Sequence, residues 1–377
     1  MRTLEGKRVV LGITGSIAAV ECVKIVHALR RRGASVVGVM SGAACGIMHP
    51  DAITYACGAP SITRISGMVE HVRHCGEGGE ADLLLIAPCT ANTLCKIAAG
   101  IDDTPVTTFA TTAIGRGMPV ILVPAMHHSM YRHPKVREAL AALPAWGITL
   151  VPPRIEEGKA KIARLDEIVL HAERACMDRP LAGTRVLVTA GPCAEPVDDV
   201  RVLTTRSSGL MGREIALGAF RLGAEVTVVH AGEPVPCVEN VATSSANEMR
   251  DAVHRLLAKR AFDFYVSAAA VSDFAPERVK GKIPSGEPVT LTLQPLPKII
   301  DEVIGRGGPR VAAFKLGRDE EAAAEALLAK GAACVVMNTP DVLGAGEGDF
   351  VILTRSSRRE VSGSKEEVAA ALWSALR

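Results

Sequence analysis

Hydrophobic runs of strand length recur along the first half of the chain, and segments long enough for crossover helices separate them. Continuous runs of Val, Ile and Leu are typical of parallel strands buried on both faces, so the pattern predicts a parallel α/β sheet. The expected strands lie near Val9–Ile13, Ser35–Met40, Leu83–Ala87, Val120–Val123 and Ile148–Val151. A helical stretch near Leu165–Met177 ends this half, because Pro180 and Gly183 stop the helix before a new strand starts.

The second half repeats the pattern and predicts a second doubly wound sheet. Its expected strands lie near Val186–Thr189, Glu225–Val229, Phe264–Ala268, Val311–Phe314 and Cys334–Met337. A late strand pair near 351–353 and 360–361 and a helix from Lys365 follow, and Ser245 and Glu248 have the spacing of a capping box. The predicted fold class is α/β, with two doubly wound, Rossmann-like domains over residues 1–178 and 179–377 and mainly parallel sheets.

Composition narrows the classes of partner. Lys and Arg total 43 and Asp and Glu total 41. A net charge of +2 gives no strong electrostatic attraction for nucleic acid or an anionic membrane. Small metabolites are the expected ligands. The ten cysteines form no CxxC pair, which indicates reduced core residues. The N-terminal segment lacks a signal-peptide pattern and no run approaches ~18 apolar residues, so we expect a cytoplasmic protein without a membrane span.

Two small-residue turns follow strands of the first half. Gly12–Ile17 (GITGSI) is neither GxGxxG nor a lysine-containing phosphate loop, which argues against a nicotinamide dehydrogenase and favours a mononucleotide. Pro88–Thr93 (PCTANT) follows another strand and adds small hydrogen-bonding residues. Because ligands bind at the carboxyl ends of parallel strands, we expect both turns to converge on one molecule.

Together with Pro124–Tyr131 (PAMHHSMY), these turns resemble the flavin-dependent cysteine decarboxylases that bind FMN. The whole chain is similar to the bifunctional phosphopantothenoylcysteine decarboxylase / phosphopantothenate-cysteine ligase family of coenzyme A biosynthesis. GSIAAV, Glu70-His71-Val72, PCTANT and PAMH match its motifs in order. The resemblance implies a flavodoxin-like, homo-oligomeric decarboxylase fold for residues 1–178 and a ligase domain for residues 179–377.

The family chemistry is coherent with the residues present, because losing CO2 from a C-terminal cysteine needs an electron sink that no side chain provides. FMN oxidises the thiol to a thioaldehyde, CO2 leaves, and the same flavin reduces the ene-thiol that remains. His71 would assist proton removal, and we favour it over its neighbour His74 because Val72 follows it as in the family. The implied FMN contacts are Gly15, Ser16, Ile17, Ser41, Pro88, Cys89, Thr90, Asn92 and Thr93, and the implied substrate contacts are Asn92, Met126, His127 and Thr205.

Two departures concern the decarboxylase half. His127 stands where bacterial members place the asparagine that holds the substrate carboxylate, and an N–H-donating imidazole suits that role. The flap Pro153–Lys161 lacks the cysteine that protonates the ene-thiol in bacterial members, and with PAMH it is similar to archaeal members. Lys159, Lys161 and water stay open as the replacement proton donor.

The second half resembles the ligase through Ala190–Asp198 and Arg206–Gly212, which follow the TAGPTREPID and SSGKMG patterns. The family uses CTP, or ATP in some members, to turn the carboxylate of 4′-phosphopantothenate into an acyl nucleotide that the cysteine amine attacks. Mg2+ and lysines neutralise the departing pyrophosphate. The implied nucleotide contacts are Gly191, Ser207, Ser208, Gly209, Asp273, Lys282, Pro297, Phe314 and Lys330, with Lys282 catalytic and Asp273 also a Mg2+ contact.

Departures from the ligase pattern are Thr205, Leu210, Leu296 and Gly317, each replacing a polar family residue. A buried polar partner left unmet costs about 1 to 3 kcal/mol, so we expect these departures to lower the rate of the ligase. The alternatives are an active decarboxylase half alone, or a non-catalytic FMN-binding interaction protein. The resemblance implies trimeric decarboxylase halves, dimeric ligase halves, and 4′-phosphopantothenate, cysteine and 4′-phosphopantothenoylcysteine as ligands.

Overall fold

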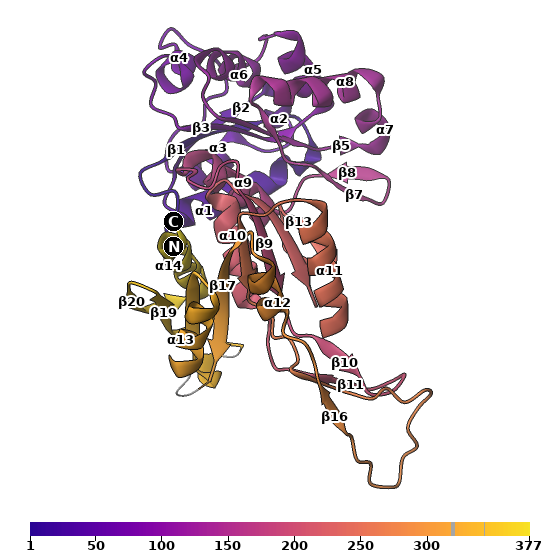
Figure 1. The fold of residues 1–377 in the computed structure, drawn as a ribbon. Helices are drawn as coiled ribbons and strands as arrows, with labels where there is room; N and C mark the ends of the chain where they lie inside the picture. The colour runs from indigo at the N-terminus through magenta and orange to yellow at the C-terminus, as the bar shows by residue number, and fades with distance from the viewer. Residues whose placement is uncertain (318–320, 343) are drawn as a thin grey trace. The chain divides into compact units, whose positions relative to one another are not determined.

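A computed structural model describes residues 1–317, 321–342 and 344–377. The chain divides into two compact units, Met1–Asp178 and Arg179–Arg377 (Figure 1). Each unit has its own sheet and its own buried apolar clusters. The predicted fold class, two α/β units with mainly parallel sheets, is confirmed.

The first unit is built on a five-stranded parallel sheet. Its strands are β1 (Arg8–Ile13), β2 (Ser35–Met40), β3 (Leu83–Cys89), β4 (Val120–Pro124) and β6 (Thr149–Leu150), in the order β2-β1-β3-β4-β6. Counted along the chain this order is 2-1-3-4-5, the flavodoxin-like arrangement, in which a flavin binds where the strand order reverses between β1 and β3. All five expected strands are present, and β6 is shorter than the apolar run that predicted it.

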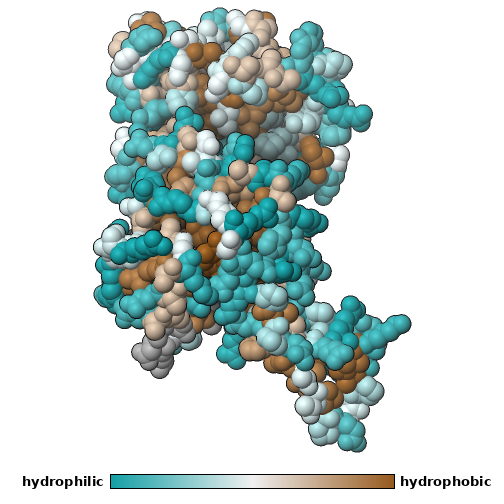
Figure 2. Space-filling view, viewed as in Figure 1, coloured by the Kyte–Doolittle hydropathy of each residue, from teal (hydrophilic) through white to brown (hydrophobic). Residues whose placement is uncertain are grey.

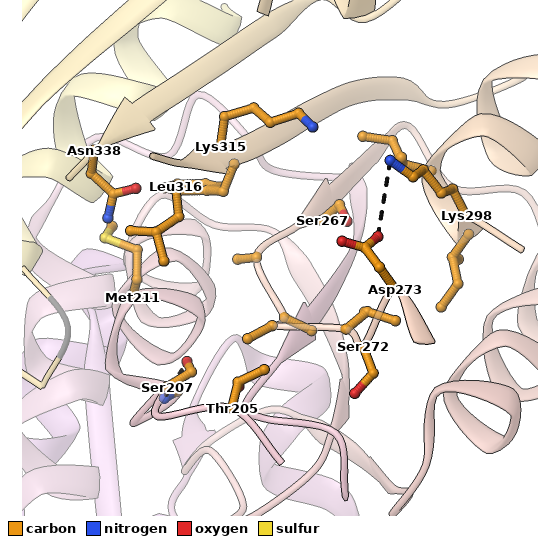
Figure 3. Close-up of a pocket in the computed structure, with 18 of the residues that line it drawn as sticks. Thr205, Ser207, Met211, Ser267, Ser272, Asp273, Lys298, Lys315, Leu316 and Asn338 are labelled. Atoms are coloured by element: carbon orange, nitrogen blue, oxygen red, sulfur yellow. Dashed lines mark hydrogen bonds and ion pairs between the residues drawn. The ribbon is translucent and has the colours of Figure 1, made fainter. Parts of the chain in front are cut away.

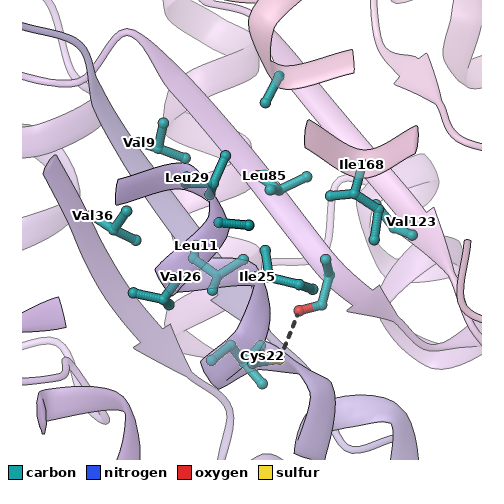
Figure 4. Packing of buried hydrophobic residues seen from close by; sticks show 14 of the residues in the cluster. Val9, Leu11, Cys22, Ile25, Val26, Leu29, Val36, Leu85, Val123 and Ile168 are labelled. Carbon is teal, nitrogen blue, oxygen red and sulfur yellow. Dashed lines mark hydrogen bonds between the residues drawn. The ribbon is translucent and has the colours of Figure 1, made fainter. Parts of the chain in front are cut away.

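Helices cover both faces of this sheet because successive strand residues point to opposite sides. Leu11 and Leu85 belong to the cluster that includes residues of α1 (Cys22–Arg31), α3 (Pro50–Cys57) and α9 (Leu165–Cys176) (Figure 4). Val10 and Leu84 belong to the cluster on the other face, with α5 (Ala91–Ala99), α6 (Pro105–Arg116) and α8 (Pro134–Ala142). Each fully buried aliphatic side chain contributes about 1.5 to 3 kcal/mol, so these clusters stabilise the packing of the helices on the sheet.

His171 of α9 makes the stability of this unit sensitive to acid. Burial chiefly, and Arg174 next, lower the pKa of His171 from 6.5 to about 4. The unfolded chain therefore takes up a proton that the folded chain refuses, and stability is full above pH 6.5 and falls as the pH drops toward about 4. We expect His171→Gln to remove about 2 kcal/mol of the difference in unfolding free energy between pH 7.5 and pH 5, measured by urea unfolding at both pH values.

The exposed His49 provides the matched control, because His49→Gln makes the same substitution at the surface. An unfolding free energy that keeps the wild-type dependence on pH in His171→Gln would contradict the assignment.

The second unit carries an eight-stranded sheet. Its strands are β13 (Glu239–Ala242), β12 (Glu225–His230), β9 (Arg185–Ala190), β14 (Phe264–Ser267), β17 (Arg310–Leu316), β18 (Cys334–Asn338), β19 (Glu347–Thr354) and β20 (Arg358–Ser364), in that spatial order. The first six are parallel and read 3-2-1-4-5-6 along the chain, the Rossmann order. β19 and β20 are the expected late pair, antiparallel and longer than predicted.

Helices α10 (Leu210–Arg221), α11 (Ala246–Lys259), α12 (Ile299–Arg306), α13 (Glu321–Lys330) and α14 (Lys365–Leu376) accompany this sheet. One detail of α11 was predicted wrongly. Ser245 caps the helix by accepting the Glu248 N–H at 3.3 Å, but the Glu248 carboxylate accepts the N–H of Ser244 at 2.7 Å. The returning bond therefore falls one residue before the cap and does not complete the predicted capping box.

Two antiparallel strand pairs form an arm of the second unit that extends away from its sheet (Figure 1). They are β10 (Ala194–Pro196) with β11 (Val202–Thr204), and β15 (Phe274–Pro276) with β16 (Leu293–Pro295). None of the ten cysteines, each within the described residues, forms a disulfide. In the part of the chain that the structure describes, no helix has the length and apolar character needed to cross a membrane.

Candidate functional site

Three loops at the carboxyl edge of the first sheet are joined by hydrogen bonds. Thr14 Oγ1 donates to the Pro88 carbonyl at 2.7 Å and accepts the Thr90 N–H at 3.0 Å. The Ala125 N–H donates to the Cys89 carbonyl at 3.1 Å. The loops after β1, β3 and β4 therefore meet where the strand order reverses, as expected for a single ligand at this edge. Thr14 makes two of these bonds, and sequence reasoning missed it.

Gly15 brings the loop after β2 into the same place. A Cβ on Gly15 would lie 2.5 Å from the Ala43 Cβ and 3.2 Å from the Ala43 carbonyl carbon, so only glycine allows this approach. The Ser41 N–H donates to the Ile13 carbonyl at 3.0 Å, which ties the end of β2 to the end of β1. The two loops form a close backbone surface of the kind that a phosphate approaches.

Small hydroxyl residues cap the helices that start at this edge. Ser16 Oγ accepts an N–H at the start of the 3-10 helix η1 (Ile17–Glu21), and Ser41 and Thr90 cap α2 (Gly42–Cys45) and α5 in the same way. Thr90 Oγ1 accepts the Thr93 N–H at 3.3 Å, and the side chain of Asn92 is exposed beside it. The residues predicted to hold FMN are thus helix caps and their neighbours.

A pocket of about 800 Å³ lies between η1, the loop after β4 and a strand pair near residue 158. The predicted residues Ser16, Ile17, Met126 and His127 lie in its walls, with Ile25, Ile162 and Ile168 among the apolar ones. Ile17 is 77% exposed, so it presents an apolar face to any ligand there. The other predicted FMN contacts lie in the neighbouring turns, outside these walls: Gly15, Ser41, Pro88, Cys89, Thr90, Asn92 and Thr93.

The predicted flap is a β-hairpin attached to the PAMH segment. β5 (Met126–His127) pairs with β8 (Lys159–Lys161), which pairs with β7 (Arg154–Glu156). Its turn has positive φ at Glu157 (51°) and Gly158 (68°), as a two-residue hairpin requires.

Lys161 Nζ lies 2.9 Å from Glu157 and 3.3 Å from Glu156, and the hydrogen bond to Glu157 raises the pKa of Lys161. Lys159 is exposed, and its ammonium has no acceptor among the described residues.

The two candidate histidines of α4 (Glu70–Cys75) differ in their surroundings. His74 is 8% exposed and stacks on Phe109, and burial lowers the pKa of its imidazole. His71 is half-buried, meets the edge of the Phe109 ring at 6.4 Å between centroids, and has no hydrogen-bond partner for Nδ1 among the described residues. His71 does not belong to the described walls of the pocket near His127.

The geometry of the first unit fits a flavin. The β1/β3 reversal, the Gly15 approach and the apolar walls around Ile17 and Met126 suit a phosphate at one end and a flat ring at the other. Burial raises the pKa of the Cys89 thiol, so this fully buried cysteine stays protonated behind the turn.

A second pocket, of about 630 Å³, lies at the carboxyl edge of the second sheet (Figure 3). The predicted residues in its walls are Thr205, Ser207, Ser208, Gly209, Asp273, Pro297, Phe314 and Lys330. Gly191 lies behind the wall: its φ is +85°, and a Cβ there would lie 1.8 Å from the Ala231 carbonyl. A Cβ on Gly209 would lie 3.1 Å from the Gly191 Cα, so Gly191 supports the serine loop without lining the pocket.

Lysines surround this pocket on several strand and helix ends. Lys298 Nζ lies 3.9 Å from the Asp273 carboxylate (Figure 3), and Lys330 Nζ lies 3.0 Å from Asp301. Lys315 also lines the pocket. Sequence reasoning missed Lys298, because a lysine after a proline looks like a surface charge.

No group of three or more His, Cys, Asp or Glu in the described residues is placed to hold a metal, so Asp273 alone would be a single ligand.

Lys282 lies outside the described walls, in a loop of the arm that two carboxylates anchor. Asp198, whose side chain is fully buried, accepts the N–H groups of Ile283 at 3.0 Å, Val200 at 2.8 Å and Arg201 at 2.6 Å. These bonds, that of Ile283 first, lower the pKa of Asp198. Asp199 holds the other side of Lys282 by accepting the Gly281 N–H at 3.0 Å.

Comparison with known proteins gives the family. A model described as Flavoprotein matches residues 1–175, and one described as DNA/pantothenate metabolism flavoprotein C-terminal domain matches residues 181–377. The Coenzyme A biosynthesis bifunctional protein CoaBC of Thermococcus kodakarensis is 45% identical over 99% of this chain and 95% of its own length.

Two crystal structures resemble separate parts of the chain. The C-terminal domain of a CoaBC protein is 28% identical, with a TM-score of 0.44, over 52% of this chain and 95% of that chain. The FMN-dependent cysteine decarboxylase SpaF is 27% identical, with a TM-score of 0.40, over 45% of this chain and 98% of that chain. From the two family models and the full-length relative, the chain belongs to the family of coenzyme A biosynthesis bifunctional proteins, CoaBC.

Proposed function

We propose that this chain converts 4′-phosphopantothenate and cysteine into 4′-phosphopantetheine in two steps of coenzyme A biosynthesis. The second unit acts as the ligase and the first as the decarboxylase. Membership of the CoaBC family supports both activities. The observation that carries the decarboxylase is the meeting of three hydrogen-bonded loops at the β1/β3 reversal, beside an apolar pocket.

In the first unit, the backbone around Gly15 and Ser16 and the caps Ser41 and Thr90 would hold FMN, and Ile17 and Met126 would contact its ring. Bound FMN supplies the electron sink, taking two electrons from the cysteine thiol and returning them after CO2 has left. The exposed His127 imidazole, 2.9 Å from Ser129 Oγ at Nδ1, donates to the substrate carboxylate.

His71 removes the proton from the substrate and acts across a boundary between copies of the chain. It lies outside the described pocket walls of its own unit, and the residues around it carry exposed apolar side chains: Met68 is 71% and Val72 is 44% exposed. Apolar surface of this kind favours association. A homo-oligomer with FMN at the boundary between copies brings a second chain's His71 to the ring.

Lys159 is the best-placed donor for protonating the ene-thiol, since the carboxylates of Glu156 and Glu157 hold Lys161. We expect Lys159→Met to slow formation of 4′-phosphopantetheine by about 10-fold or more, with release of a product two hydrogens lighter. Lys161→Met is the matched control and should retain the wild-type product. Equal product profiles for the wild type and Lys159→Met, by mass spectrometry, would exclude Lys159 and leave water as the donor.

In the second unit, Lys298, Lys315 and Lys330 line the pocket and would neutralise the triphosphate of CTP or ATP. Asp273 would be the protein ligand of a Mg2+ ion that arrives with the nucleotide. Lys282, on its anchored loop, neutralises charge as pyrophosphate leaves. The serine loop Ser207–Gly209 and Thr205 contact the acyl part.

The test is a mass spectrum of the products from 4′-phosphopantothenate, cysteine, Mg2+ and either CTP or ATP. We expect a nucleoside monophosphate, CO2 and 4′-phosphopantetheine. No nucleoside monophosphate, with supplied 4′-phosphopantothenoylcysteine still decarboxylated, would leave only the first unit active. Neither activity, with FMN bound, would make the chain a non-catalytic flavoprotein.

A further inference from the structure

Lys365 is a buried lysine in the wall of the second-unit pocket. It is the first residue of α14, is 7% exposed, and lines the pocket together with Asn338, Val342 and Phe350. Its own N–H donates to the Gly346 carbonyl at 3.1 Å, which fixes the start of α14 beside the loop that follows β18. The residue is therefore largely buried and borders the pocket.

The ammonium of Lys365 has no partner among the described residues. The two carboxylates next to it in sequence are used elsewhere: Glu366 lies 3.2 Å from Arg221, and Glu367 accepts the Ser364 N–H at 2.8 Å. Burial lowers the pKa of Lys365, with no opposing charge to restore it. A buried charge without a partner is costly, and such charges are paired in most folded proteins.

The position at the start of α14 adds to this cost. The first turn of a helix carries a partial positive charge, so a cation there is disfavoured and an acid is preferred. Glu366 and Glu367 follow that preference, and Lys365 does not. Neither packing nor helix formation explains a lysine here, whereas a ligand with negative charge would.

The side of the pocket that suits a nucleotide is the one across from Asn338. In Figure 3, Asp273 and Lys298 lie on one side, and Asn338 and Met211 lie on the other. The helix that Lys365 begins, α14, contacts both α10 and β18, and Asn338 is the last residue of β18. The N-terminus of α10, which Gly209 precedes, also lines the pocket. That helix end adds a second positive element to the Lys365 side.

We propose that Lys365 binds the anionic group of the non-nucleotide substrate, a phosphate monoester or a carboxylate, at the Asn338 side of this pocket. The inference deepens the proposed ligase function and rests on it. Two substrates bring this chemistry: 4′-phosphopantothenate carries a phosphate, and cysteine carries a carboxylate. The ammonium gains its missing partner only when the substrate is bound.

The test replaces Lys365 by Met, which suits a buried site and lacks the charge, and by Arg, which keeps the charge. Lys259→Met, at the exposed end of α11, is the matched control. Isothermal titration with 4′-phosphopantothenate, pantothenate and inorganic phosphate needs no turnover, so it reports on Lys365 even if no nucleoside monophosphate is formed. Steady-state KM values for cysteine and for cysteamine, which lacks the carboxylate, form the second arm.

We expect Lys365→Met to weaken one anion by roughly 10- to 100-fold, with Lys365→Arg retaining part of the affinity and Lys259→Met all of it. Weaker binding of 4′-phosphopantothenate with unchanged binding of pantothenate would show that Lys365 binds the phosphate. A higher KM for cysteine with an unchanged KM for cysteamine would show that Lys365 binds the carboxylate. Affinities and KM values in Lys365→Met equal to those of the wild type, whatever its melting temperature, would overturn the proposal.

Discussion

Replacing His71 with asparagine is expected to lower CO2 release from supplied 4′-phosphopantothenoylcysteine by about 10²- to 10⁴-fold while leaving the bound flavin in place. Asparagine keeps the polarity of the site but cannot take up the substrate proton. His71 has no hydrogen-bond partner for Nδ1 among the described residues and stands beside Phe109 rather than in the pocket wall, so its loss should leave the loops at the flavin edge unchanged. The readouts are CO2 release and the flavin absorbance of the same sample.

A subunit-mixing experiment tests whether His71 acts in the pocket of a neighbouring copy of the chain. If His71 serves the pocket of a neighbouring copy, an inactive His71→Asn chain and an inactive His127→Ala chain should regain part of the activity when dissociated and reassociated together. His49→Asn, at an exposed histidine, is the matched control for the substitution. Wild-type turnover in His71→Asn would refute the catalytic role, and mixtures as inactive as their components would refute action across the boundary.

The second large effect is expected in the loop of Lys282. Lys282→Met should lower formation of the nucleoside monophosphate by about 10²- to 10³-fold, because one charge that stabilises the departing pyrophosphate is lost. Asp198→Asn should lower it as well, since this carboxylate accepts the Ile283 N–H next to Lys282. Lys280→Met, at an exposed lysine of the same loop, should keep the wild-type rate.

A double-mutant cycle decides whether Asp198 acts through Lys282. Combining Asp198→Asn with Lys282→Met should then cost little more than Lys282→Met alone, whereas independent sites would add. Decarboxylation of supplied 4′-phosphopantothenoylcysteine is the internal control, and it should be unchanged in all three variants. Fully additive losses would show that Asp198 affects the ligase in another way.

Most strands of both sheets could be predicted because they are continuous apolar runs, such as Leu83–Cys89, whose seven residues are all buried. The edge strand β13 was missed, because its four residues are mostly exposed and form no apolar run. Buried parallel strands leave this signal in the sequence whatever their partners are. The flavodoxin-like strand order of the first sheet follows from the family resemblance. The short hairpins of the flap and the arm could not be predicted. Their strands have only two or three half-exposed residues, which is too few to show the alternation of apolar and polar positions that marks a strand.

Site residues could be predicted where they belong to a sequence motif, and they were missed where only packing defines their role. Thr205, Ser207 and Phe314 were found through motifs that follow strands, and the structure places them in one pocket. Thr14 and Lys365 were missed for a physical reason: nothing in their neighbours reveals that one bridges two loops or that the other is buried. Both properties are set by packing between segments far apart in the chain.

The central claim is that the loops after β1, β3 and β4 hold one FMN. The most direct measurement is the absorption spectrum, with the mass of the released chromophore, of purified chain that has been incubated with FMN. We expect about one FMN per wild-type chain, and none in Gly15→Val, whose Cβ would lie 2.5 Å from that of Ala43. A folded wild-type chain that stays colourless and takes up no FMN would contradict it.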